Sequence, residues 1–123
     1  MAYLLDSNLL IYSAAAANAF LRPLVLDTAN FASAISKVET LGFHKLDSID
    51  EAYFNSLFAL LNTLAVTQPI IDRATVLRQQ KRMTLGDSLI AATALEYGLD
   101  IATRNVSDFA PIAGLTVYNP FEQ

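Results

Sequence analysis

Apolar residues in this chain occur either in short uninterrupted runs or in longer segments with helical periodicity. The short runs predict five strands: AYLL (2–5), ASAIS (32–36), LAVT (64–67), DIAT (100–103) and LTVY (115–118). The periodic segments predict helices over about 8–17, after Pro23, and over 37–46, 50–62, 70–80 and 84–95. Because helices separate strands that are apolar rather than alternating, the pattern favours an α/β fold with a central, mainly parallel sheet.

One of these helices is apolar on almost all sides and yet carries an acid near its start. In TLGDSLIAATAL (84–95), Asp87 shares a helical stripe with apolar residues only. Burying a carboxylate is unfavourable unless a helix N-terminus, a cation or a metal stabilises it. The helix is expected to end at Gly98, which is typical of a left-handed C-terminal cap.

The composition narrows the class of protein. The length of 123 residues predicts a single domain, 1–123, and a hydrophobic content of 54% suggests self-association, a stable partner, or only a helix-rich core. Disulfides and thiolate metal sites are excluded because there is no cysteine. The start lacks a basic segment, and the longest other apolar run, LFALLNTLAV, is too short to span a bilayer. We therefore expect a soluble, cytoplasmic protein without membrane contact.

The net charge of −4 argues against binding nucleic acid by bulk electrostatics. The segment RQQKR is a local exception, with three basic residues, Arg78, Lys81 and Arg82, just before the apolar helix. Taken alone, this cluster is interpreted as a solvated helix end that complements the helix dipole, with contact to nucleic acid as the alternative.

Four carboxylates occupy similar places in the pattern. Asp6, Glu39 and Asp108 follow predicted strands, and Asp87 lies in the first turn of the apolar helix. The carboxyl ends of parallel strands share one edge of a sheet, so these acids can converge there. Each acid taken alone could instead be a helix cap, since Ser36 to Glu39 and Thr84 to Asp87 resemble capping boxes. Several acids at one edge would repel one another and require a cation, so together they indicate a metal site.

The residue types restrict which metal such a site would take. With no cysteine and one histidine, His44, the available ligands are carboxylate oxygens, which suit Mg²⁺ or Mn²⁺ rather than Zn²⁺. Acid clusters holding such ions activate water and neutralise the charge on a phosphodiester. The residues alone therefore indicate a metal-dependent phosphate enzyme.

Four segments, LLDSNLLIY, ISKVETLGF, TLGDSLIAATAL and ATRNVSDF, resemble in order the signature blocks of PIN-domain ribonucleases, and most closely those of VapC-like toxins of type II toxin–antitoxin systems. The likeness covers nearly the whole chain. It implies a Rossmann-like α/β/α sandwich and Mg²⁺- or Mn²⁺-dependent endoribonuclease activity. It also implies a homodimer, silenced by a cognate antitoxin whose tail occupies the acidic groove.

The resemblance also assigns roles to residues. It implies that Asp6, Glu39, Asp87 and Asp108 coordinate metal, Asp108 either directly or through water. Thr103 and Asn105 would orient the last acid or a water on the metal, and Asn8 matches an asparagine of the first block, with a hydrogen bond at the helix start as the alternative. The basic residues Arg78, Lys81 and Arg82 become candidate contacts to the RNA backbone.

Two rival functions follow from the same residues. One is a non-catalytic PIN-fold module that uses the acidic pocket for regulatory binding, which a missing acid would have favoured. The other is a metal-dependent phosphatase, which LLDSN disfavours because it lacks the D-x-D pattern of many such enzymes. The tyrosines and phenylalanines are interpreted as core or dimer contacts rather than as platforms for bases.

Overall fold

Five short parallel strands form one central sheet in the computed structural model, which describes residues 2–122. The strand order is β3-β2-β1-β4-β5, and every neighbouring pair is parallel. The strands are β1 (Tyr3–Leu5), β2 (Phe31–Ser33), β3 (Asn62–Leu64), β4 (Asp100–Ala102) and β5 (Val117–Tyr118). The sequence-based prediction of a parallel five-stranded sheet is confirmed.

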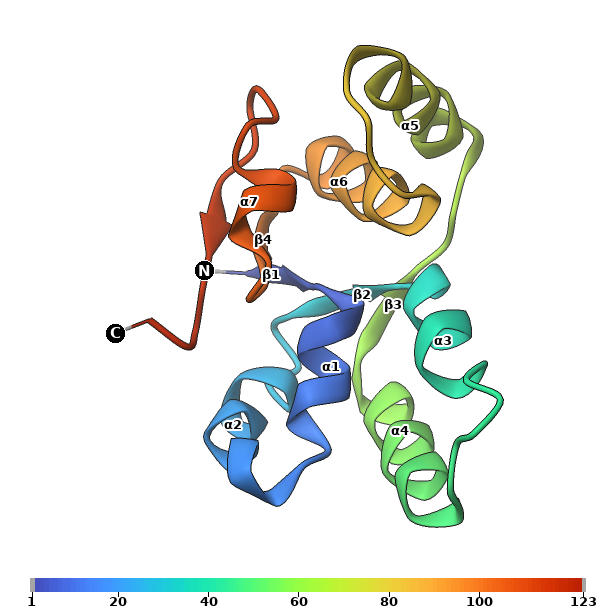
Figure 1. The fold of residues 1–123 in the computed structure, drawn as a ribbon, viewed down its shortest axis with the longest axis vertical. Coiled ribbons are helices and arrows are strands. Elements are labelled where there is room, and N and C mark those ends of the chain that lie inside the picture. Colours follow the sequence, from blue (N-terminus) through green and yellow to red (C-terminus); the bar gives the residue numbers. More distant parts are fainter. Residues whose placement is uncertain (1, 123) are drawn as a thin grey trace.

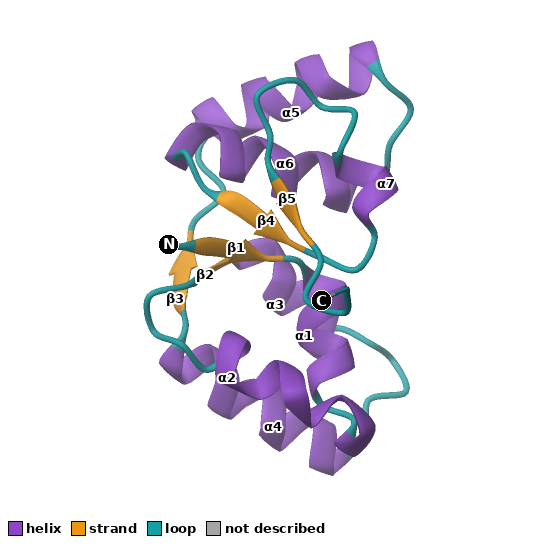
Figure 2. Ribbon diagram, turned by 90° about the vertical axis from the view of Figure 1, so that its left-hand side faces the viewer, coloured by secondary structure: helices purple, strands orange, loops and turns teal. Residues whose placement is uncertain are grey.

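Helices cover both faces of this sheet. Figures 1 and 2 show α5, α6 and α7 on one side and α1, α2 and α4 on the other. The helices are α1 (Ser7–Ser13), the 3-10 helix η1 (Ala16–Leu21), α2 (Arg22–Val25), α3 (Ala34–Leu41), α4 (Ser48–Leu60), α5 (Gln68–Gln80), α6 (Leu85–Tyr97) and α7 (Val106–Phe109). No helix within residues 2–122 is long and apolar enough to cross a membrane.

The layers arise because successive side chains of a strand point to opposite faces. Leu4 of β1 and Ile101 of β4 are fully buried in a core shared with α5 and α6. The next residues along, Leu5 and Ala102, are fully buried in a second core shared with α1, α2 and α4. Apolar residues at consecutive strand positions therefore produce the predicted α/β/α sandwich.

The predicted boundary between the second strand and its helix is wrong by three residues. We expected a strand over 32–36 and a helix over 37–46, but β2 ends at Ser33 and α3 begins at Ala34 and ends at Leu41. The Ser33 side chain caps α3 by accepting a hydrogen bond from the Ile35 N–H at 3.2 Å. Apolar Ile35 suggested a longer strand because it packs against the sheet core from inside the helix.

Two other elements differ for related reasons. β3 lies at Asn62–Leu64 rather than 64–67, because this strand is at the edge of the sheet, where exposed polar residues are compatible with pairing. α1 ends at Ser13 rather than near residue 17, and the alanine-rich segment beyond it forms the start of η1.

Candidate metal centre

The candidate site lies at the carboxyl ends of the central strands. β1 is flanked by β2 and β4, so the chain after β1 continues to one side while β4 pairs on the other. Ligands of open α/β sheets bind at such a switch point. Asp6 follows β1, Glu39 lies on the helix after β2, and Thr103 follows β4.

Asp6 is the most deeply placed acid of the four. Its side chain is 3% exposed, and its Oδ2 accepts a hydrogen bond from the Thr103 hydroxyl at 2.8 Å. Burial raises the pKa of this carboxyl from 3.8 to about 6, and the charges of Asp87 and Glu39 act in the same direction against the Thr103 hydrogen bond. Asp6 precedes α1 but makes no side-chain cap, so the capping alternative fails for this residue.

Glu39 is exposed and held from two sides. Its Oε1 accepts a hydrogen bond from the Ser7 hydroxyl at 2.7 Å, and the Ser7 and Ser36 hydroxyls, both buried, are 2.7 Å apart. Its Oε2 rests on the backbone of α6, where a Cβ on Gly86 would lie only 2.6 Å away. Since Ser36 lies inside α3, the predicted capping box of Ser36 and Glu39 is wrong.

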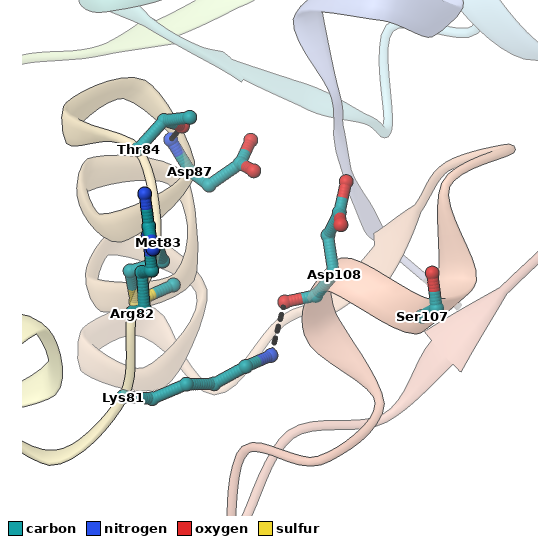
Figure 3. Close-up of a pocket in the computed structure, with 7 residues that line it drawn as sticks. All are labelled: Lys81, Arg82, Met83, Thr84, Asp87, Ser107 and Asp108. Atoms are coloured by element: carbon teal, nitrogen blue, oxygen red, sulfur yellow. Dashed lines mark hydrogen bonds between the residues drawn. The ribbon is translucent and has the colours of Figure 1, made fainter.

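Asp87 combines a capped backbone with a free-facing carboxylate. Its N–H donates to the Thr84 hydroxyl at 3.1 Å, so Thr84 caps α6 as the pattern predicted. The carboxylate points across an open cleft toward the side chain of Asp108 (Figure 3). Burial raises the pKa of Asp87, the charges of Asp108 and Glu39 raise it further, and Thr84 and Lys81 act against them. Asp87 therefore lies within electrostatic reach of the other three acids.

The cleft between α6 and α7 has a volume of about 530 Å³ and carries both signs of charge. Its lining residues are Lys81, Arg82, Met83, Thr84, Asp87, Ser107 and Asp108. The Lys81 ammonium donates to the backbone carbonyl of Asp108 at 3.1 Å. Arg78, the third predicted basic residue, lies outside this cleft and donates to the Met83 carbonyl at 3.3 Å.

The predicted polar residues lie beside Asp6. Thr103 was expected to orient Asp108 or a water on the metal, and its hydroxyl donates to Asp6 and accepts the Asn105 N–H at 3.0 Å. Asn8 is exposed on the first turn of α1. The roles of Ser36 beside Ser7 and of Gly86 beside Glu39 were not predicted: Ser36 was interpreted only as a possible cap, and the position of Gly86 directly before Asp87 was the one available signal.

The donor set suits a hard divalent cation, although the carboxylates are spread out. Within residues 2–122, no three acidic or histidine side chains lie close enough to hold one ion together. The one ion pair in this part of the chain joins Arg73 and Glu96 on α5 and α6, so none of the four acids is in an ion pair, and Lys81 acts on Asp87 only from a longer distance. Oxygen ligands with unpaired, mutually repelling charge are what Mg²⁺ or Mn²⁺ binds in proteins.

The strand order and the acids at the switch point define an α/β protein with an acidic site at the carboxyl ends of its parallel strands. Comparison with known proteins agrees with this class. The model of the PIN domain family matches residues 3–115. The chain therefore belongs to the PIN domain family, as its four sequence blocks predicted. No curated protein matches the sequence.

Solved structures resemble the whole chain. A toxin–antitoxin complex from Klebsiella pneumoniae contains a chain 31% identical, with 98% of this chain and 99% of that chain covered at a TM-score of 0.78. FitAcB from Neisseria gonorrhoeae is 26% identical over the full length of both chains, with a TM-score of 0.77. DNA-bound VapBC from Salmonella typhimurium contains a chain 21% identical, with 96% of this chain and 97% of that chain covered at a TM-score of 0.81. At this identity the likeness supports the fold alone. The predicted VapC-like type of PIN domain is thereby confirmed.

Proposed function

We propose that residues 1–123 form one PIN domain that acts as a metal-dependent endoribonuclease, the toxin of a toxin–antitoxin pair. The observation that carries this proposal is the Asp6 carboxylate. It is buried, it is hydrogen-bonded by Thr103, and it faces the charges of Glu39 and Asp87 without a basic partner. Such an arrangement lowers stability unless a cation offsets the repulsion.

Each residue of the proposed site has a distinct task. Asp6, Glu39, Asp87 and Asp108 would hold Mg²⁺ or Mn²⁺, Asp108 directly or through water. An ion bound there supplies Lewis-acid activation of water and neutralises charge at the phosphodiester. Thr103 orients Asp6, and the buried serines orient Glu39. Asn105 supports Thr103 through its N–H.

The basic residues of the cleft bind the substrate in this proposal. Lys81 and Arg82 line the same cleft as Asp87 and Asp108, where they can contact RNA phosphates on either side of the reacting one. Arg78 does not line this cleft, although it lines a neighbouring pocket with Lys81 and Arg82, and it is the weakest of the three candidates. Steering by two local cations compensates for the negative net charge.

The proposed partners follow from exposed apolar surface and from the structural neighbours. Ile11, Phe43, Leu46 and Phe54 line a pocket of about 250 Å³ that also contains Glu39. An antitoxin segment seated there would cover apolar surface and one acid together. A second apolar pocket between α5 and α6, of about 510 Å³, offers a surface for the homodimer. With RNA as the substrate, we place the activity in the cytoplasm.

The test is cleavage of a mixed RNA pool by the purified chain with Mn²⁺, EDTA serving as the blank. Wild type should release fragments with 5′-phosphate and 3′-hydroxyl ends, and Asp6→Asn should release none while remaining folded. Asp72→Asn, which changes an exposed acid on α5, is the matched control and should cleave like wild type. A folded wild type that binds RNA or an antitoxin but never cleaves would support the non-catalytic PIN module instead.

A further inference from the structure

One arginine and three aromatic rings form a cluster that is separate from the four acids. Arg104 Cζ lies 4.4 Å from the ring centroid of Phe121 and 5.2 Å from that of Tyr12. The Tyr12 and Phe121 rings meet edge to face at 5.7 Å, and Phe20 packs against Phe121 in the same way at 5.2 Å. These four residues are called the Arg104 cluster below.

The cluster is connected to the acidic site through two elements. Arg104 directly follows Thr103, whose hydroxyl binds Asp6. Tyr12 lies on α1, which begins immediately after Asp6, and six residues of helical rise place it about 9 Å along the axis from that acid. Asn8 and Tyr12 are one turn apart and share a face of α1. This face therefore leads from the acids to the Arg104 cluster.

The cluster remains open to solvent. The Phe20 side chain is 51% exposed, and Arg104 is exposed as well. Arg104 forms no ion pair with any residue of the described 2–122 range. Phe121 packs against Tyr12 and so holds the C-terminal segment against α1. The exposed parts of the Phe20 ring and of Arg104 are available to contact a ligand.

We propose that the Arg104 cluster stacks an unpaired base of single-stranded RNA beside the phosphodiester held at the acids. Aromatic rings and guanidinium planes are the surfaces on which proteins stack splayed bases. A base within a duplex is closed on both faces, so the cluster selects single strands. The inference takes RNA from the proposed function and adds the required state of the substrate. It also revises the interpretation of these aromatics as core or dimer contacts only.

The test measures binding of a short labelled single-stranded RNA, and of the same sequence as a duplex, to the Asp6→Asn protein in EDTA. Phe20→Ala and Arg104→Lys should each weaken single-strand binding about tenfold, because each removes a stacking surface and the lysine keeps the charge. Duplex binding should change little. Tyr97→Ala is the matched control, since Tyr97 is 50% exposed at the far end of α6.

Three results would overturn the inference: unchanged single-strand affinity in both variants, equal losses for the duplex, or no measurable binding of single strands. A lower melting temperature with unchanged affinity would assign the cluster to fastening the C-terminal segment. Cleavage by wild type with Mn²⁺, measured in parallel, separates the two proposals. If single-strand binding depends on Phe20 but wild type does not cleave, the base-stacking proposal stands and the nuclease proposal is refuted. If wild type cleaves but binding does not depend on Phe20, the nuclease proposal stands and the base-stacking proposal is refuted.

Discussion

The ionised carboxylate of Asp6, at the centre of the site, lowers the stability of the folded chain. Its carboxyl is 3% exposed and its pKa is raised to about 6, mainly by burial. A raised carboxyl pKa means that the folded chain binds the proton more tightly than the unfolded chain does. The free energy of unfolding therefore falls as pH rises from about 4 to 6. Above that window the full cost of about 3 kcal/mol is present.

Asp6→Asn should consequently stabilise the metal-free protein at pH 7.5 by about 2 to 3 kcal/mol. At pH 4 it should have little effect, because Asp6 is then largely protonated in wild type. The asparagine oxygen still accepts the Thr103 hydrogen bond, so the comparison isolates the charge. Denaturant unfolding of both proteins in EDTA at the two pH values gives the measurement. A stability difference independent of pH would contradict the assignment of the cost to ionised Asp6.

Gly86 makes room for a carboxylate. In Gly86→Ala the new Cβ would collide with Glu39 Oε2, the mobile end of an exposed side chain. We expect Mn²⁺ affinity to fall about tenfold or more. Stability should hold or rise, by at most about 1 kcal/mol, because alanine is the better helix former.

The control for Gly86 is a double-mutant cycle. In a Glu39→Ala background, Gly86→Ala should have no further effect on Mn²⁺ binding. Titration calorimetry of the four proteins provides the comparison. An equal loss in both backgrounds would show that Gly86 acts by another route than Glu39.

At the scale of elements, α6 ends where a single glycine permits it. Gly98 adopts φ 65° and ψ 36°, the left-handed conformation that ordinary side chains avoid. Gly98→Ala should lower the free energy of unfolding by about 1 kcal/mol, and Gly98→Asn by less, since asparagine tolerates this region. Thermal and denaturant unfolding would measure both. No heavy atom lies within 4 Å of the added Cβ, so equal losses would point to something other than backbone strain.

Elements were predictable where apolar spacing and burial coincide. The buried strands β1 and β4, helix α6 and its stop at Gly98 follow directly from the pattern. The edge strand β3 was misplaced because its residues are polar, and α3 was started late because Ser33 caps it in place of Ser36. Local patterns cannot distinguish two serines three residues apart when tertiary packing decides between them.

The acids of the candidate site could be identified from the sequence, but the residues that hydrogen-bond them could not. A carboxylate directly after a strand is visible in the sequence. The partner of Asp6 is not, because Thr103 lies 97 residues away and meets it only through the pairing of β1 with β4. The register that aligns Leu5 with Ala102 brings the two following residues together.

At the scale of the whole molecule, the basic residues at and after the end of α5 differ in whether they line the acidic cleft. Arg82 lines the cleft with Asp87 and Asp108, and Arg78 does not. Arg82→Ala should therefore weaken RNA binding more at low salt than at high salt, and Arg78→Ala should have a smaller effect because Arg78 lines only the neighbouring pocket. Binding isotherms over a salt series would reveal the difference. Equal effects of the two substitutions at every salt would remove the cleft from the substrate path.

The central claim is that the four acids near the carboxyl edge of the sheet bind a cation. Its most direct test is thermal unfolding with and without millimolar Mn²⁺, for wild type, Asp87→Asn and the exposed control Asp72→Asn. Binding to the folded state alone raises the melting temperature, so wild type and the control should be stabilised and Asp87→Asn should not. A wild type unmoved by Mn²⁺, together with an Asp87→Asn protein that melts far lower, would instead mean that the Asp87 carboxylate chiefly stabilises the first turn of α6.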